Sequence, residues 1–235
     1  CYCEAPHLFR NVLRVLAVAE KAGWNYEVIL VEDKSPDRTA EIVQRLAASQ
    51  PRVKAILHDR NRGRGAAVMT GVAAAQGRIV GFFDIDLEVA PEYMLACVTE
   101  VRAGARLVVG ARHYSAAKTP VRTILSRSYR GLAFAVLGIP PHVDSESGYK
   151  FFDRDSIAKL APILEHTGWF WDTEVVYRYF AAGFDVRTVP CEFIRDPTKR
   201  STVRIFKDSV DYARALRAFA RKHGRLRRYR TSSSP

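Results

Sequence analysis

Residues 79–88 read IVGFFDIDLE, a run of apolar and small residues that ends in two carboxylates one position apart, Asp84 and Asp86. The run predicts a buried strand at 79–83, so both carboxylates would follow its carboxyl end. Hard cations such as Mg²⁺ and Mn²⁺ prefer carboxylate oxygens and often complete their coordination shell with nucleotide phosphates. The stretch therefore indicates a metal-assisted site for a nucleotide diphosphate, although a strand end followed by a solvated turn has the same pattern.

Strand patterns alternate with helical patterns on both sides of this stretch. Strands are expected at 27–31, 53–57, 79–83, 106–109 and 186–194 with an extended segment at 149–152, and helices at 7–21, 37–48, 65–76, 91–103, 120–137 and 173–182. The alternation predicts an α/β fold in which helices flank a mostly parallel central sheet and the ligand lies beyond the carboxyl ends of the strands. No strand precedes the first helix, and residues 1–4 look like the end of one. The chain is therefore expected to begin inside its own fold.

The composition favours one catalytic domain, expected at 1–200, because 235 residues of which 48% are hydrophobic can bury a large core. Four cysteines without a C-x-x-C pair indicate ordinary thiols in a reducing compartment. No signal or transit segment is visible. The longest apolar stretch, 131–141, is about half of the roughly 20 residues that a membrane span requires, so we expect no span.

The formal charge of +12 is concentrated in the carboxyl-terminal part of the chain. Residues 199–230 hold twelve Lys or Arg against two acids, a net +10. Apolar residues at intervals of three and four predict an amphipathic helix at 203–222, within a basic segment at 201–230. We expect this helix to pack on the domain with a basic edge toward an anionic membrane surface; a plain solvated face and nucleic-acid binding are the alternatives. Residues 231–235 read as disordered.

Several short motifs, in order along the chain, resemble those of the inverting family 2 glycosyltransferases of the GT-A fold. Within that family they are most similar to the polyprenyl-phosphate (dolichyl-phosphate) mannosyl- and glucosyltransferases. The matching stretches are YCE at 2–4, VEDKSPDRT at 31–39, NRGRGA at 61–66, DIDLE at 84–88, GAR at 110–112, R-x-x-x-S at 122–126 and DSESGYK at 144–150. The resemblance implies a GT-A domain that moves a hexose from GDP-mannose or UDP-glucose to a polyprenyl phosphate.

The resemblance assigns the donor side of the site to residues from five stretches. A Mg²⁺ or Mn²⁺ ion would be held by Asp84, Asp86 and Glu88, although the family usually has Gln at the third position. Donor-binding residues would be Tyr2, Glu4, Asp33, Arg62, Arg64, Asp84 and Arg200. Glu32 replaces the usual first Asp of its motif and is one methylene longer. Each of these residues could instead have a purely structural role, in a turn, at a helix cap or on a solvated face.

On the acceptor side, Arg122 and Ser126 stand four apart and share a helix face, and Arg112 follows a nearby strand. Two guanidiniums and a hydroxyl suit a phosphate monoester, which is already ionised near pH 7 and needs no strong base. A sugar-hydroxyl acceptor would need a carboxylate base, for which Asp144 or Asp172 is the candidate. Asp86, Arg112, Arg122, Ser126 and Asp144 are thus the predicted catalytic residues. The expected location is the cytoplasmic face of a membrane; a nucleotidyltransferase is a further alternative.

Overall fold

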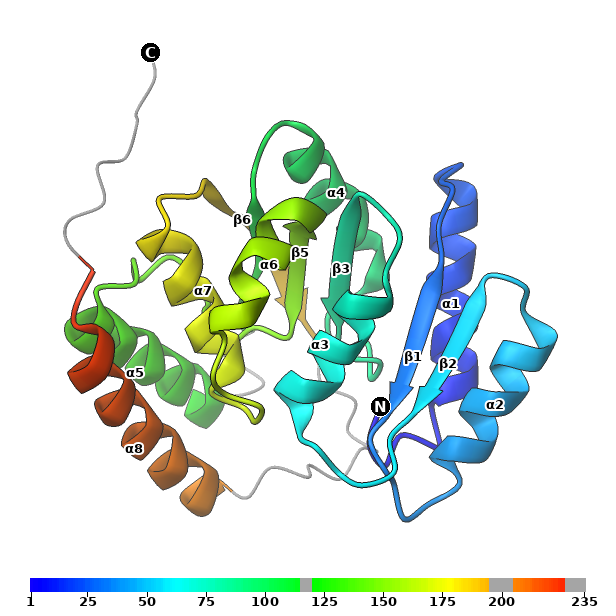
Figure 1. Ribbon diagram of the computed structural model, residues 1–235, viewed down its shortest axis with the longest axis horizontal. Coiled ribbons are helices and arrows are strands. Elements are labelled where there is room, and N and C mark those ends of the chain that lie inside the picture. Colours follow the sequence, from blue (N-terminus) through cyan, green and yellow to red (C-terminus); the bar gives the residue numbers. More distant parts are fainter. Residues whose placement is uncertain (115–119, 195–204, 227–235) are drawn as a thin grey trace.

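The computed structural model describes residues 1–114, 120–194 and 205–226, with the backbone alone for 114, 120–127 and 205–209 (Figure 1). Strands and helices alternate through most of the chain. The strands are β1 (Val28–Glu32), β2 (Val53–Leu57), β3 (Ile79–Phe83), β4 (Leu107–Tyr114), β5 (Tyr149–Asp153) and β6 (Val186–Phe193). The helices are α1 (Leu8–Lys21), α2 (Thr39–Ser49), α3 (Arg64–Ala74), α4 (Met94–Arg102), α5 (Pro120–Leu137), α6 (Arg154–Leu160), α7 (Trp171–Ala181) and α8 (Ile205–His223).

The strands form two sheets with helices on both faces, which confirms the α/β architecture (Figure 1). β1 and β2 pair in parallel, and the second sheet has the order β3-β5-β4-β6. β4 and β6 are parallel, whereas β5 runs antiparallel to both of its neighbours. The second sheet is therefore more mixed than the mostly parallel sheet expected from the alternation, because the chain re-enters it at β5 from the opposite end.

Burial follows the sequence pattern closely. In α1 the buried positions Leu8, Val12, Val15 and Ala19 recur at intervals of three and four, the spacing of one helix face. In β4 three successive residues, 107–109, are fully buried, so this strand is covered on both faces as a central strand should be. Elements whose apolar residues recur with a single helix or strand spacing were therefore located well from the sequence.

The carboxyl-terminal helix α8 is part of the core. Tyr212, Leu216 and Phe219 are buried in the same apolar cluster as Trp171 of α7 and Leu137 of α5. The predicted helix at 203–222 thus packs on the domain, at the lower left of Figure 1. Within the described residues, no helix combines the length and the apolar character that crossing a bilayer demands. The expected disordered end at 231–235 lies outside the described residues.

Three local predictions differ from the structure. The helix expected at 91–103 begins as a 3-10 turn, Pro91–Tyr93, before α4. The strand expected at 106–109 continues to Tyr114, because β6 pairs with its whole length. Helix α6 was not predicted, although the Asp153 side chain caps it by accepting a hydrogen bond from the Ser156 N–H at 3.0 Å.

Candidate active site

The carboxyl ends of β1 and β3 open into one hollow of about 1650 Å³. Asp33 follows β1, while Asp84 and Asp86 follow β3, and all three residues line this hollow. Residues that were predicted from separate motifs therefore share this hollow: Tyr2, Glu4, Asp33, Arg64, Asp84, Asp86, Glu88 and Arg112. Ser147, Gly148 and Trp169 also line it.

Asp33 holds the loop that precedes α3. Its carboxylate accepts hydrogen bonds from the backbone N–H groups of Arg62 and Gly63, at 2.8 and 2.9 Å, and lies 2.7 Å from Nδ1 of His58. Gly63 has a φ of 92°, and a Cβ there would meet the Thr167 carbonyl oxygen at 2.8 Å, so only glycine fits. Asp33 is thus a positioning residue of the loop in this structure.

Glu32 shapes the next turn. Its side chain accepts hydrogen bonds from the backbone N–H groups of Lys34 and Ser35, and Lys34 has a φ of 58°. The extra methylene of Glu relative to Asp extends the carboxylate to these two donors. The departure from the family motif therefore has a local structural use.

Arg64 joins two parts of the site. Its Nε donates to Asp172 at 2.9 Å, and its Nη1 donates to Asp84. Burial alone would lower the pKa of Arg64, but the carboxylates of Asp84 and Asp172 raise it above its usual value. The guanidinium also lies 5.1 Å from the ring centroid of Trp169. Arg64 therefore fixes the direction of the Asp84 carboxylate while remaining charged.

The D-I-D-L-E segment forms a tight turn rather than a continuation of β3. The Leu87 N–H donates to the Asp84 carbonyl at 3.2 Å, and the Glu88 N–H donates to Oδ1 of Asp86 at 3.3 Å. Leu87 has a φ of 55°. Gly148 lies against the Asp84 side chain, where a Cβ would collide with Asp84 and Arg64. The turn directs both aspartates toward the hollow.

The carboxylate set fits a cation that shares its shell with phosphate oxygens. Asp84 is 45% exposed at its side chain, and Asp86 is partly buried. In the described part of the chain, no group of three or more His, Cys, Asp or Glu converges as a complete metal cage. Two hard oxygen ligands beside an open hollow are what Mg²⁺ or Mn²⁺ uses when a diphosphate supplies the remaining ligands. The ligand roles of Asp84, Asp86 and Glu88 remain predictions.

Arg112 and Asp144 form a bidentate pair at the inner wall. Nε and Nη2 of Arg112 donate to the two carboxylate oxygens at 2.7 and 3.0 Å, and the Arg112 N–H adds a third bond at 3.3 Å. The Asp144 side chain is fully buried. Burial acts to raise the pKa of Asp144, but Arg112 more than offsets it and the pKa is lowered. A carboxylate held in this way is a poor proton acceptor.

Lys150 and Asp172 form a second buried pair. The Lys150 side chain is wholly inaccessible; it donates to Oδ1 of Asp172 at 2.6 Å and also to the Ser147 carbonyl. Because the other oxygen of Asp172 accepts from Arg64, this carboxylate links β5, α3 and α7. Asp172 is disfavoured as a base because two cationic side chains, those of Lys150 and Arg64, bind its carboxylate.

Glu146 is a site residue that sequence reasoning did not single out. Burial, with a smaller contribution from the nearby carboxylates of Asp144 and Asp172, raises the pKa of Glu146 to about 7, although the positive charge of Arg112 acts in the opposite direction. Glu146 is partly buried between the two ion pairs. Its position in D-S-E-S-G, between two polar positions, gave no signal that separated it from a solvated glutamate.

The remaining predicted residues are placed as follows. The Arg62 side chain is half exposed and pairs with Asp59 at 2.9 Å, so its backbone rather than its guanidinium belongs to the Asp33 loop. Arg122 and Ser126 lie in α5, but their side chains are outside the described residues. Arg200 is outside them altogether.

Comparisons with known proteins agree with this arrangement. Residues 1–180 match the family described as Glycosyl transferase family 2. The chain is 33% identical over 187 residues to the glycosyltransferase AglD of Haloferax volcanii, covering 78% of this chain and 30% of that protein. It is 31% identical over 186 residues to a dolichyl-phosphate beta-glucosyltransferase of Trichomonas vaginalis, covering 74% and 55%. The chain thus spans about half or less of the length of these relatives.

The fold is also found in a solved structure, the glucosyl-3-phosphoglycerate synthase of Mycobacterium tuberculosis in complex with Mn²⁺ and UDP-glucose. The TM-score is 0.65 at 18% identity, and the match covers 93% of this chain and 77% of that one. Together with the strand and helix order, this likeness confirms the predicted GT-A fold.

Proposed function

The chain belongs to glycosyl transferase family 2, and on that premise we propose that it transfers a hexose from a nucleotide-diphosphate sugar to a polyprenyl phosphate. The observation that carries the proposal is the convergence of Asp33, Arg64, Asp84 and Asp86 on one hollow at the carboxyl ends of β1 and β3. Relatives that are named as dolichyl-phosphate glucosyltransferases support the acceptor class.

The donor would lie with its diphosphate beside the β3 turn. Asp84 and Asp86 would hold the divalent cation that the structural neighbour also contains, with Arg64 keeping Asp84 in place. When bound, this cation neutralises the charge that develops on the departing nucleotide. The loop that Asp33 fixes brings the backbone before α3 to the same edge, where helix N-terminal N–H groups favour phosphate.

The acceptor would approach from the side of β4 and α5. Arg122 and Ser126 are proposed to bind its phosphate. Arg112 lines the wall of the hollow, where its pair with Asp144 holds its guanidinium in place. A phosphate monoester is an ionised nucleophile near pH 7, so orientation and proximity supply the main rate gain.

A transferase that acts on a sugar hydroxyl is the second candidate. It would need a proton acceptor, and neither Asp144 nor Asp172 is suited because each is bound by cationic side chains. Glu146, whose pKa burial raises to about 7, would be the better base in that case. The lipid-phosphate acceptor is favoured because both candidate carboxylates, Asp144 and Asp172, are already bound by cationic side chains.

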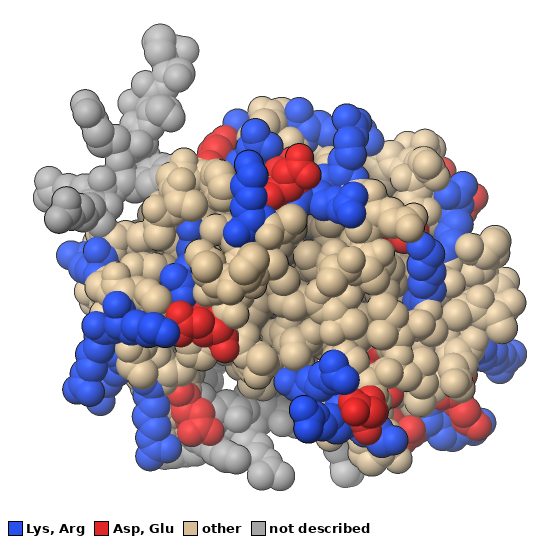
Figure 2. Space-filling view, viewed as in Figure 1, with Lys and Arg blue, Asp and Glu red and all other residues tan. Residues whose placement is uncertain are grey.

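Membrane association would use the edge formed by α5 and α8. Arg214, Arg217, Arg221 and Arg225 are exposed, and Lys and Arg side chains are prominent over this edge at the lower left of Figure 2. Phe134 of α5 is also exposed, with the Arg225 guanidinium 5.3 Å from its ring centroid. Basic side chains next to exposed apolar ones suit the headgroup region of an anionic leaflet.

A donor screen tests the proposal. The protein is incubated with Mn²⁺ and a panel of UDP- and GDP-sugars, with and without a short polyprenyl phosphate, and nucleotide release is measured. We expect release with one class of donor only, dependent on both the metal and the lipid phosphate. Pyrophosphate release from a nucleoside triphosphate would instead identify a nucleotidyltransferase.

A further inference from the structure

Trp169 presents an exposed aromatic ring to the hollow. It is 53% exposed and lines the hollow, whereas Trp171, two positions later, is wholly buried. Trp171 occupies space that Gly65 leaves free, since a Cβ on Gly65 would meet the Trp171 Cβ at 2.5 Å. The two rings of one segment therefore differ in role: Trp171 belongs to the core, and Trp169 belongs to the wall of the site.

The segment that carries Trp169 is held on both sides of the ring. Before it, the buried Glu174 carboxylate accepts hydrogen bonds from the backbone N–H groups of Glu165 and His166, at 3.0 and 2.9 Å. The Thr167 carbonyl accepts one at 3.1 Å from the first turn of α3. After the ring begins α7, whose first turn donates to the Trp169 carbonyl at 3.4 Å. Trp169 is therefore exposed at a fixed place in the fold.

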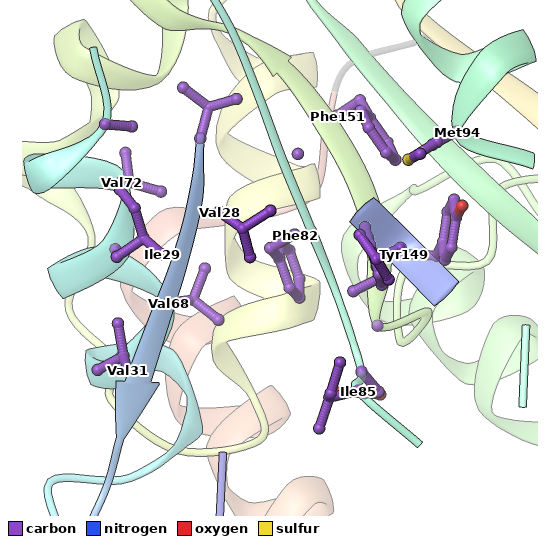
Figure 3. A pocket seen from close by; sticks show the side chains of 18 of the residues that line it. Val28, Ile29, Val31, Val68, Val72, Phe82, Ile85, Met94, Tyr149 and Phe151 are labelled. Atoms are coloured by element: carbon purple, nitrogen blue, oxygen red, sulfur yellow. The ribbon is translucent and has the colours of Figure 1, made fainter. Parts of the chain in front are cut away.

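The Arg64 guanidinium connects this ring with the predicted metal ligand Asp84. Its Cζ lies 5.1 Å from the ring centroid of Trp169 and 5.7 Å from that of Phe82, which Figure 3 shows directed into the hollow. The same guanidinium donates to Asp84 and, at 2.9 Å, to Asp172. Only one side chain thus separates the Trp169 ring from the carboxylate at which the proposed donor is held.

An exposed aromatic face beside charged groups suits a sugar. A pyranose ring has C–H bonds that can pack on an indole face, and hydroxyl groups that can form hydrogen bonds with neighbouring carboxylates and guanidiniums. An isoprenoid chain would need a longer apolar surface, and the neighbouring charges of Arg64 and Asp84 would lose hydration against it without gaining hydrogen bonds. The surroundings of Trp169 therefore favour the hexose over the lipid as its occupant.

We propose that Trp169 binds the hexose of the donor by packing its indole face against C–H bonds of the pyranose ring. The inference rests on the proposed function, because it takes the donor to be a nucleotide-diphosphate sugar held at Asp84. In such a donor the hexose is bonded to the second phosphate, so it lies next to the diphosphate and on the side of the hollow that Trp169 lines. Trp169 then contributes to the binding and choice of the sugar, while other residues bind the nucleotide.

A purely structural role of Trp169 would act through Arg64. Loss of the ring would loosen the guanidinium and with it the Asp84 carboxylate, and this would weaken the binding of a nucleotide diphosphate and of a nucleotide sugar by the same factor. A ring that contacts the hexose contributes only when the hexose is present. The ratio of the two affinities therefore separates contact with the sugar from support of Arg64.

Calorimetry in the presence of Mn²⁺ measures this ratio, as the affinity for UDP-glucose relative to UDP and for GDP-mannose relative to GDP. Trp169→Ala removes the ring, Trp169→Leu keeps an apolar side chain without an aromatic face, and Trp169→Phe keeps a smaller aromatic face. Ile163→Ala is the matched control, because Ile163 is similarly exposed, at 47%, and precedes the same segment but lies outside the hollow. Circular dichroism checks that each variant is folded.

We expect Trp169→Ala and Trp169→Leu to lower the ratio of sugar to nucleotide affinity at least about fivefold, as the loss of one aromatic contact implies, and Trp169→Phe and Ile163→Ala to leave it within about twofold. An unchanged ratio in Trp169→Ala, with or without an equal loss of both affinities, would overturn the inference and leave the proposed function standing. If the unaltered protein bound neither nucleotide sugar with Mn²⁺, the proposed function and the inference would both be overturned.

Discussion

Replacing Arg112 by Ala tests whether the Arg112–Asp144 pair holds the inner wall together. The substitution removes both guanidinium bonds from a carboxylate that is fully buried. Removing one partner of a buried pair typically costs about 3 to 5 kcal/mol, since the remaining charge is left uncompensated. For a chain of this length, each kcal/mol shifts Tm by about 2 to 4 °C, so we expect a fall on the order of 10 °C.

Two further variants separate charge from geometry. Arg112→Lys keeps the positive charge but loses the planar fork, so it should recover only part of the loss. The double variant Arg112→Ala/Asp144→Ala leaves no orphaned carboxylate. It should therefore lose clearly less than the sum of the two single variants, with a coupling of about 2 kcal/mol.

The same pair predicts a pH dependence. Because the folded-state pKa of Asp144 is lowered, despite burial, by Arg112, the native state binds fewer protons than the unfolded state in the acid range. The stabilisation is present above the unfolded pKa near about 4 and is lost as the pH falls through the folded value. Arg112→Ala should therefore show a shallower loss of stability on acidification than the unaltered protein.

Urea unfolding followed by tryptophan fluorescence measures these effects, at neutral pH and at several acid values. A loss below about 1 kcal/mol in Arg112→Ala, or strictly additive single and double variants, would show that the pair is not what stabilises the wall.

Three further predictions concern the metal site, the partly buried glutamate and the basic edge. Asp84→Asn and Asp86→Asn should each weaken Mn²⁺-dependent binding of a nucleotide sugar at least about tenfold in calorimetry, and unchanged affinity in both would remove the metal site. Burial raises the pKa of Glu146 to about 7, so the native state binds more protons between about pH 4.5 and 7 and stability should fall as pH rises there. Glu146→Gln should abolish that fall in urea titrations, and an unchanged slope would refute the shift. Arg214→Gln with Arg217→Gln should reduce sedimentation with anionic vesicles at low salt about thirtyfold, each charge near the surface being worth about 1 kcal/mol; equal partitioning would exclude this edge.

The basic edge must be tested by surface substitution rather than by deletion. Tyr212, Leu216 and Phe219 are buried in the main core, so a chain without α8 would expose that core and bind membranes for unrelated reasons. The sequence showed the apolar stripe and the charge, but the face that α8 covers depends on α5 and α7, which lie far away in sequence.

Much of the fold was predictable because, in most elements, the apolar residues recur with a single helix or strand spacing. The strands at 53–57 and 79–83 and the helix at 120–137 have the predicted limits, since turn residues or charges flank a clear apolar pattern. The direction of β5 was not predictable from its own residues. An extended segment has the same pattern in either direction, and only its partners β3 and β4 determine which one it takes.

The sequence predicted which residues gather in the site. It did not predict which other residues several of these side chains bind. Asp33 and Asp84 were correctly predicted to follow strands, and both line the same hollow. The bonds of Asp33 to the loop before α3, and the chain of contacts from Lys150 through Asp172 to Arg64, join residues that are 22 to 108 positions apart. Short motifs carry no signal of that separation, so each carboxylate looked available.

The proposed function depends on whether the nucleophile is a lipid phosphate or a hydroxyl, and the two acceptors can be compared in one assay. With the donor identified and Mn²⁺ present, initial rates of hexose transfer are compared for a short polyprenyl phosphate and for the same polyprenol without its phosphate. We expect transfer to the phosphate alone, and a fall of about 10- to 150-fold in acceptor kcat/KM for Arg122→Ala, since a charge-assisted pair is worth about 1.5 to 3 kcal/mol. Equal turnover with the unphosphorylated polyprenol would contradict it and would make a hydroxyl the nucleophile.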